Sequence, residues 1–317
     1  MTARARVRSP AKRAAKAPPR PRAAAVARPI VKWAGGKSKL LGALLPRVPT
    51  NIRTYAEPFA GGAALFFALA SEAAGRKQNR RRFERAILWD QNPELVACYR
   101  AVRDDVAGVI GALEGYRYDR ELFYAVREQD TSEMSDVERG ARFIFLNRTC
   151  FNGLWRVNAR GKFNVPFGRY DDPKILDREA LLAAAKALAG VEIGCGDFAA
   201  ATRGLGAGDF VYFDPPYDPA SKTSDFTSYA SGGFSYEEQK RLADEMRRLR
   251  REGALVLLSN ADTEAMRELY FDFEVASVEA PRSINSNGAR RGMAPELLVA
   301  SWGRPEGERP RRARKRA

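Results

Sequence analysis

The chain has 317 residues, of which 54 are Lys or Arg and 39 are Asp or Glu, so its net charge is +15. It contains no histidine, which excludes Ser-His-Asp hydrolysis, Cys-His proteases and His-ligated metal centres. The three cysteines lie far apart with no Cys-x-x-Cys motif, which fits a reducing compartment and argues against a zinc site. The length suits one large α/β domain and a smaller one.

The positive charge lies in the two ends of the chain. Residues 1–28 carry nine Lys or Arg and no acid, and residues 304–317 carry seven and two, whereas residues 29–303 carry 38 basic and 37 acidic side chains. Both ends are rich in Ala, Pro and Arg, so we predict disordered tails attracted to nucleic acid phosphates. A solvated tail without a role is the alternative. Residues 1–28 lack the apolar core of a secretory signal, and no run is long enough for a transmembrane helix.

The first structured segment, residues 29–41, has a short apolar start, a double glycine (Gly35-Gly36) and a helix-like run. This pattern predicts a turn whose backbone amides face a ligand. It is not a Walker motif, because Ile30 or Val31 would have to be glycine.

A strand, a glycine turn and a helix are predicted next, over residues 54–74. This order is the first unit of a doubly wound nucleotide-binding fold, although the G-x-G-x-x-G of NAD enzymes is absent. A basic insert (Gly75–Arg85) leads to a second strand, Ala86–Asp90. Asp90 at its end is placed to accept from ribose hydroxyls, and a helix cap before Pro93 is the alternative.

Residues 93–148 are predicted to be helical, and the segment from Arg142 to Tyr170 then changes character. Its turn signals indicate a hairpin and loops. Basic side chains with exposed aromatic rings would hold phosphates and stack on bases, and an aromatic mini-core with a solvated basic rim is the alternative. The basic residues are Arg142, Arg148, Arg156, Arg160, Lys162 and Arg169, and the aromatic ones are Phe151, Trp155, Phe163, Phe167 and Tyr170.

A helix (Arg178–Ala189) and a third strand (Val191–Ile193) are predicted to lead to Asp197 and Phe198. At the end of that strand, Asp197 could hydrogen-bond the amino group of a cofactor adenine, and Phe198 could pack on its ring.

The apolar run Phe210–Phe213 predicts a buried strand, which ends at Asp214-Pro215-Pro216-Tyr217 because proline cannot donate to a sheet. This set suits methyl transfer to an exocyclic amine. Asp214 and the Pro215 carbonyl could accept from an adenine N6, Tyr217 could stack on the base, and the remaining task is alignment. A turn with Tyr217 as packing is the alternative.

The last third of the chain is predicted to complete the sheet. We expect a loop or lid over Asp218–Gly233, a helix from a capping box at Ser235 and Glu238 to about Arg251, a strand over Ala254–Ser259, a helix over Thr263–Tyr270, strands over Phe273–Glu279 and Leu297–Ser301, and a basic loop over Arg282–Arg291.

Together these motifs resemble the Dam-type (D12 class, α group) N6-adenine DNA methyltransferases, collinearly over roughly residues 29–302. The motifs are Lys32–Lys37, Glu57–Gly62, Asn152–Arg156 with Phe163–Tyr170, Asp214–Tyr217, Ser259-Asn260 and Arg282–Gly288.

The resemblance implies a Rossmann-like S-adenosylmethionine-dependent sheet with a smaller helical or hairpin DNA-recognition domain inserted. It implies S-adenosylmethionine as methyl donor and a flipped adenine, in GATC or a close relative, as acceptor. The expected segments are a basic tail (1–28), a catalytic part (29–92), a target-recognition insert (93–172), a second catalytic part (173–303) and a basic tail (304–317).

The resemblance also assigns site residues. Arg156 would read a guanine, and Leu154 and Pro166 would pack on a thymine methyl. The catalytic residues are Asp214, Pro215, Pro216 and Tyr217; the cofactor residues are Trp33, Lys37, Glu57, Phe59, Gly61, Asp90, Asp197, Phe198 and Asp214; the DNA-binding residues are Lys32, Phe151, Asn152, Leu154, Arg156, Pro166, Arg169 and Tyr170.

We therefore expect an enzyme that acts on double-stranded DNA as a monomer or weak dimer, without metal or membrane, in the cytoplasm near a prokaryotic or phage genome. Methyl transfer to RNA or to protein glutamine, and a catalytically silent DNA-binding protein of the same fold, are the alternatives. The basic aromatic insert argues against the first, and the intact Asp214–Tyr217 motif argues against the second.

Overall fold

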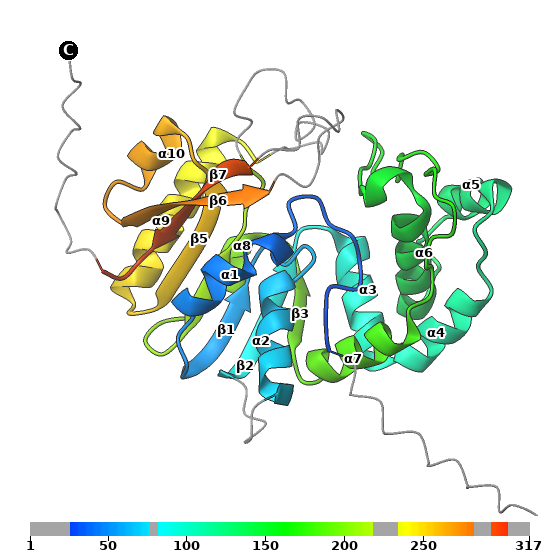
Figure 1. The fold of residues 1–317 in the computed structure, drawn as a ribbon, viewed down its shortest axis with the longest axis horizontal. Helices are drawn as coiled ribbons and strands as arrows, with labels where there is room; N and C mark the ends of the chain where they lie inside the picture. The colour runs from blue at the N-terminus through cyan, green and yellow to red at the C-terminus, as the bar shows by residue number, and fades with distance from the viewer. Residues whose placement is uncertain (1–25, 76–81, 218–233, 282–292, 304–317) are drawn as a thin grey trace, which may run out of the picture.

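The computed structural model describes residues 26–75, 82–217, 234–281 and 293–303, and these form a seven-stranded sheet with helices on both faces (Figure 1). The strand order is β3-β2-β1-β4-β5-β7-β6, in which β1 to β5 are parallel and β7 runs antiparallel to its neighbours β5 and β6. The strands are β1 (Ile52–Glu57), β2 (Phe83–Asp90), β3 (Glu192–Cys195), β4 (Phe210–Phe213), β5 (Leu255–Ala261), β6 (Glu274–Pro281) and β7 (Met293–Ala300).

The central strands are buried on both faces, which explains their nearly continuous apolar sequences. Tyr55 and Phe210 pack in one hydrophobic cluster with side chains of α2 (Ala64–Gly75), whereas their neighbours Ala56 and Val211 pack in a second cluster with α9 (Tyr236–Arg251). Successive residues of a strand point to opposite faces, so α2 and α9 cover opposite sides of the sheet.

A group of helices lies beside the sheet and continues one of its two clusters. The helices are α4 (Val106–Glu114), α5 (Arg120–Glu128) and α6 (Asp136–Thr149), seen on the right of Figure 1. They are joined to the sheet by α3 (Pro93–Asp104), which packs against β2, β3 and α6, and by α7 (Arg178–Leu188). The apolar side chains of α3 to α6 belong to the same cluster as Tyr55 and Phe210, so sheet and helices share one core.

Shorter elements complete the described chain. They are the 3₁₀ turns η1 (Lys37–Lys39), η2 (Leu45–Arg47) and η3 (Phe151–Gly153), and the short helices α1 (Leu41–Leu44), α8 (Phe198–Ala201) and α10 (Glu264–Leu269).

The expected α/β fold class is confirmed, and the differences are local. The predicted hairpin and loops within Arg142–Tyr170 are present in irregular form. After α6 ends at Thr149, the chain reverses between the antiparallel bridges Val157–Phe163 and Cys150–Phe167, and Asn164 N donates to the Arg156 carbonyl. The capping box at Ser235 is half formed: Ser235 Oγ accepts from Glu238 N, but the Glu238 carboxylate binds Arg241. The predicted tails and the loops at 218–233 and 282–291 lie outside the described residues, apart from Val26, Ala27 and Arg28.

Candidate functional site

The candidate site lies at the carboxyl ends of four adjacent parallel strands. The order β3-β2-β1-β4 places Asp197, Asp90, the glycine turn after Glu57, and Asp214 along one edge of the sheet. In open α/β sheets this edge binds ligands. The sequence predicted these strand ends separately, and the tertiary fold brings them together.

Asp214 follows β4 and is held by two side chains from distant parts of the chain. Lys37 Nζ lies 2.8 Å from Asp214 Oδ1, with the two side chains 6% and 20% exposed. Ser259 Oγ, at the end of β5, donates to the same oxygen at 2.9 Å. Burial raises the pKa of the Asp214 carboxyl, and Lys37 and Ser259 oppose that shift. The carboxylate therefore sits in a largely dry, preorganised setting.

Lys37 contacts the Asp214–Tyr217 tetrapeptide as well as the glycine loop in which it lies. Its Nζ also donates to the Gly35 carbonyl at 2.8 Å and lies 4.5 Å from the centre of the Tyr217 ring. Gly35 has a φ of 75°, a conformation that favours glycine and turns the loop toward the ammonium. The turn at Gly35-Gly36 thus places the Lys37 ammonium next to the Asp214 carboxylate.

Tyr217 is held through its hydroxyl by Glu296, a residue of β7 that the sequence analysis missed. The hydroxyl donates to Glu296 Oε2 at 2.6 Å. Burial raises the pKa of the Glu296 carboxyl, with Lys37 opposing the shift. The only signal in the sequence was an acid directly before the apolar run 297–300.

Asp90 ties the end of β2 to the glycine turn. Its Oδ2 accepts from Gly61 N and its Oδ1 from Asn92 N, both at 2.9 Å. Asn92, rather than Asp90, caps α3 by accepting from Glu94 N and Leu95 N. The helix-cap alternative for Asp90 is therefore wrong. Each carboxylate oxygen keeps a further lone pair with which it can accept from a ligand hydroxyl.

Trp33 packs directly on the glycine turn. A Cβ added to Gly61 would lie 2.6 Å from Trp33 Cδ1, and the φ of Gly61 is 46°. Tyr99 donates to the Gly61 carbonyl at 2.7 Å. Both the close approach and the left-handed backbone require glycine here, so the turn and the indole form one surface beside Asp90.

Glu57 and Phe59, two predicted cofactor residues, are engaged within the protein. Oε1 of Glu57, a fully buried residue, accepts from the Tyr55 hydroxyl and from Phe66 N, and burial raises the pKa of its carboxyl to about 8. Phe59 packs against Phe198, with ring centres 5.5 Å apart. Their part in cofactor binding stays a prediction.

The buried Glu57 predicts a pH-dependent stability. The folded chain holds its proton to about pH 8, whereas an ordinary glutamate releases it near 4.5. Between these values the folded state binds more protons, so the free energy of unfolding falls as pH rises, by at most about 1.4 kcal/mol per pH unit. Glu57→Gln keeps the acceptor oxygen and should flatten that slope in urea unfolding at pH 5, 6.5 and 8. Parallel curves for parent and variant would contradict the buried neutral carboxyl.

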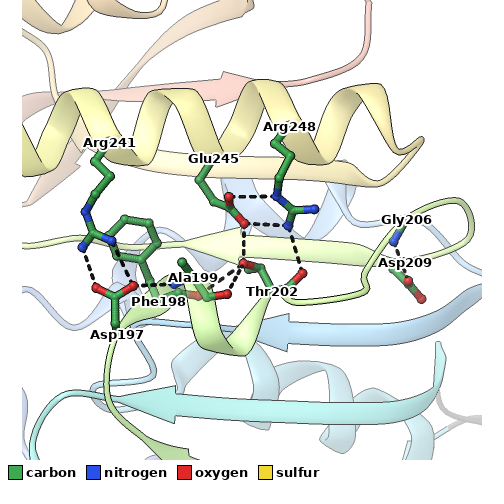
Figure 2. A network of polar contacts seen from close by, with 9 residues as sticks. All are labelled: Asp197, Phe198, Ala199, Thr202, Gly206, Asp209, Arg241, Glu245 and Arg248. Carbon is green, nitrogen blue, oxygen red and sulfur yellow. Dashed lines mark hydrogen bonds and ion pairs between the residues drawn. The ribbon is translucent and has the colours of Figure 1, made fainter.

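Asp197 and Phe198 occupy the start of α8, where Arg241 of α9 covers both (Figure 2). Asp197 caps α8 by accepting from Ala199 N at 2.9 Å, and both its oxygens accept from the Arg241 guanidinium. The Phe198 ring is 1% exposed and has Arg241 Cζ 4.2 Å from its centre. The ring turns into the core in this structure, and its packing on a cofactor adenine stays a prediction.

The predicted DNA-binding residues gather on one surface, next to the end of α6. Lys32 Nζ donates to the Tyr170 hydroxyl at 3.2 Å, which in turn donates to the Cys150 carbonyl. Phe151 N donates to the Pro166 carbonyl at 2.9 Å, and Phe151 itself is 48% exposed. Residues from the first and third sequence motifs therefore meet here.

Other residues of that basic aromatic segment have structural roles. Arg142 is buried and donates to the carbonyls of Val126 and Arg127, and Arg148 donates to that of Ile30. Trp155 packs on Phe143 and Phe163, with ring centres 3.9 and 4.5 Å apart. The aromatic mini-core alternative is thus correct for Trp155 and Phe163, and of the five aromatic residues only Phe151 is classed as exposed.

A Rossmann-like sheet with carboxylates at its edge and an Asp-Pro-Pro-Tyr turn defines an S-adenosylmethionine-dependent amino-methyltransferase. Residues 33–284 match the family model of the D12 class N6 adenine-specific DNA methyltransferases. The chain belongs to this family, as its motifs had indicated.

The match extends over nearly the whole length of several relatives. The chain is 40% identical to Type II methyltransferase M1.LlaDCHI of Lactococcus lactis subsp. cremoris over 87% of this chain and 96% of that protein. It is 40% identical to Type II methyltransferase M.MjaIII of Methanocaldococcus jannaschii (87% and 99%) and 34% identical to DNA adenine methylase of Vibrio cholerae (86% and 95%). A putative class I S-adenosylmethionine-dependent methyltransferase from Listeria monocytogenes is a distant structural likeness, with 11% identity, a TM-score of 0.38, and 87% of this chain and 62% of that chain covered.

S-adenosylmethionine is the methyl donor of this family, and the hydrogen-bonding groups of the site fit this cofactor. The carboxylates of Asp90, Asp197 and Asp214 line the edge that would face the hydroxyls, amines and positive charge of this cofactor. Among the described residues no group of three or more Cys, Asp or Glu is arranged to hold a metal ion. In the same part of the chain, no helix is both long and apolar enough to cross a bilayer.

Proposed function

We propose that the chain methylates N6 of a flipped adenine within a specific duplex sequence, GATC or a close relative. The observation that carries this proposal is the setting of Asp214, which is ion-paired with Lys37, bonded by Ser259 and followed by a Tyr217 that Glu296 holds in place. Membership of an adenine-specific DNA methyltransferase family and relatives named DNA adenine methylase support it.

We assign separate tasks to the two oxygens of Asp214, which the contacts of its side chain support. Both contacts described above fall on Oδ1, so we assign Oδ2 to the amino group of the target adenine. The Pro215 carbonyl accepts a hydrogen bond from the second N6 hydrogen. The two acceptors concentrate electron density on a nitrogen whose lone pair is otherwise delocalised, and they do so where positive charge develops. Tyr217 stacks on the base. S-adenosylmethionine, when bound, would supply the methyl group, whose bond to sulfur breaks as the bond to N6 forms and N6 loses a proton.

Sequence recognition is assigned to the surface that contains Lys32, Arg156 and Pro166. Arg156 Nε donates to Asn164 Oδ1 at 2.7 Å, which orients the guanidinium for a guanine edge. Leu154 and Pro166 pack on a thymine methyl, and the exposed Phe151 fills the space of an unstacked base. Lys32, Asn152 and Arg169 contact the DNA, and Tyr170 holds Lys32 in position.

Arg156→Ala should relax discrimination at one base pair of the site by about 1–3 kcal/mol, because a bidentate contact to guanine is lost. The measurement is the methylation rate on duplexes that carry every single-base change in the recognition sequence. Lys162→Ala, an exposed change in the same segment, should weaken binding evenly and leave discrimination intact. If the Arg156 variant still discriminated at every position, Arg156 would have no role in base reading.

We also propose that residues 93–172 form the target-recognition part and residues 29–92 and 173–303 the catalytic part, that the enzyme acts as a monomer or weak dimer, and that it works close to the genome of a prokaryote or phage. The basic tails would add non-specific affinity for DNA.

Mass spectrometry of nucleosides from unmethylated duplex DNA incubated with the chain and S-adenosylmethionine tests the proposed reaction. N6-methyladenine establishes the reaction, and sequencing of the modified sites tests GATC. DNA that remains unmodified would refute the proposal and direct attention to RNA, to protein glutamine or to DNA binding without catalysis.

A further inference from the structure

Two amide side chains are buried beneath the catalytic tetrapeptide. They are Gln239 in the first turns of α9 and Asn260 in β5, and both are 0% exposed. Asn260 Nδ2 donates to Gln239 Oε1 at 3.0 Å, and Gln239 Nε2 donates to the Pro216 carbonyl at 3.1 Å. A buried amide is unfavourable unless it is hydrogen-bonded. The Pro216 carbonyl supplies the acceptor that the buried Gln239 amide needs.

The hydrogen bond from Gln239 to the Pro216 carbonyl restrains ψ of Pro216, a torsion that the proline rings do not fix. The rings of Pro215 and Pro216 fix φ at both residues, and a following proline also restricts ψ of Pro215. The ψ of Pro216 is not restricted in this way. It sets both the direction of the Pro216 carbonyl and the path of the chain into Tyr217, so a donor that fixes this carbonyl also fixes Tyr217.

We propose that Gln239, oriented by Asn260, is a positioning residue that sets the direction of Tyr217 toward the target base. This inference rests on the proposed roles of Asp214 and Tyr217. Tyr217 is then held at two points, at its backbone by Gln239 and at its hydroxyl by Glu296. The Pro215 carbonyl, one peptide earlier, stays directed at the substrate amine.

The contacts of Asn260 support an orienting role. Its Oδ1 accepts from Ala261 N at 2.8 Å, which leaves its Nδ2 to donate to Gln239. With Oε1 occupied in this way, the Gln239 amide cannot flip without bringing two donors together, so Nε2 faces Pro216.

Two variants of Gln239 separate positioning from packing. Gln239→Leu keeps the size of the side chain and removes the donor, so kcat should fall about tenfold to a hundredfold while the affinities for S-adenosylmethionine and DNA stay within about twofold. Gln239→Glu is isosteric and donates only when protonated. Its kcat relative to the parent should be highest at the lowest pH and fall as the introduced carboxyl ionises. Asp214 and Glu296 titrate in both chains, so the ratio isolates the change.

Thr202→Val is the matched control. Thr202, at the C-terminal end of α8, is as buried as Gln239 and donates to Glu245 of α9, the helix that carries Gln239 (Figure 2). This variant should lower the melting temperature but leave kcat within about twofold, because the buried bond it removes does not touch the tetrapeptide.

The outcomes are distinct when kcat is measured well below the melting temperature of each variant. The positioning role alone is overturned if the parent is active and Gln239→Leu leaves kcat unchanged. It is also overturned if Thr202→Val lowers kcat as much as Gln239→Leu does. A parent that methylates no adenine overturns the proposed function and this inference with it. A loss of kcat in Gln239→Leu, restored at low pH in Gln239→Glu, supports the inference.

Discussion

Asp214→Ala is expected to reduce methyl transfer to a small fraction of the parent rate while DNA binding stays largely intact. The substitution removes an acceptor at the nitrogen that attacks, and the loss of one preorganised group at a developing charge lowers kcat by about 10² to 10³-fold. It also leaves the buried Lys37 ammonium without the carboxylate 2.8 Å away, so some loss of stability should accompany the kinetic effect. Asp214→Asn keeps one acceptor oxygen and should show a smaller destabilisation.

The experiment compares single-turnover methylation with the DNA dissociation constant for each variant. Asp209→Asn is a control at the opposite end of the same strand, where the buried carboxylate accepts from Arg53, Thr54 N and Gly206 N. It should lower stability and leave kcat nearly unchanged once the chain is folded. A loss of DNA affinity in Asp214→Ala that matched the loss of rate would mean that Asp214 lies in the DNA interface.

Asn147→Leu is expected to give the largest loss of stability among single changes near the proposed DNA-binding surface. Asn147 is fully buried, and its Oδ1 accepts from Lys32 N while its Nδ2 donates to the carbonyls of Lys32 and Gly153. It therefore joins the segment before Trp33 to the turn that carries Phe151. Leucine would leave three backbone groups without this partner, which predicts a destabilisation of about 3 kcal/mol or more.

Urea unfolding measures this change, and the DNA affinity should fall with it because Lys32 is released. Asn51→Ala, at an exposed position before β1, should change the free energy of unfolding by less than about 0.5 kcal/mol. An Asn147→Leu variant as stable as the parent would show that the three contacts contribute nothing.

The elements that sequence patterns predicted well are those whose signal is local. Phe210–Phe213 is a continuous apolar run because a central parallel strand is buried on both faces, and the two prolines after it mark its end. The glycine turn at Gly61 was recognisable for a similar reason, because a left-handed backbone in contact with Trp33 admits no side chain.

The expectations that failed concern the direction of side chains. Arg142 and Arg148 counted as basic charge in the sequence, yet both bind backbone carbonyls inside the fold. A one-dimensional pattern records residue types and does not record where their side chains point.

The sequence by itself determined the α/β class, the parallel strands, the Asp214–Tyr217 turn and the family. Each of these depends on apolar periodicity, on proline and glycine geometry or on a contiguous motif. Only the tertiary structure decided which partners complete the site: Lys37 and Ser259 on Asp214, Glu296 on Tyr217, and Gln239 on Pro216. Glu296 and Tyr217 are 79 residues apart, and they meet because β7 inserts antiparallel beside β5. Contacts of this kind depend on strand order, which no local pattern in the sequence encodes.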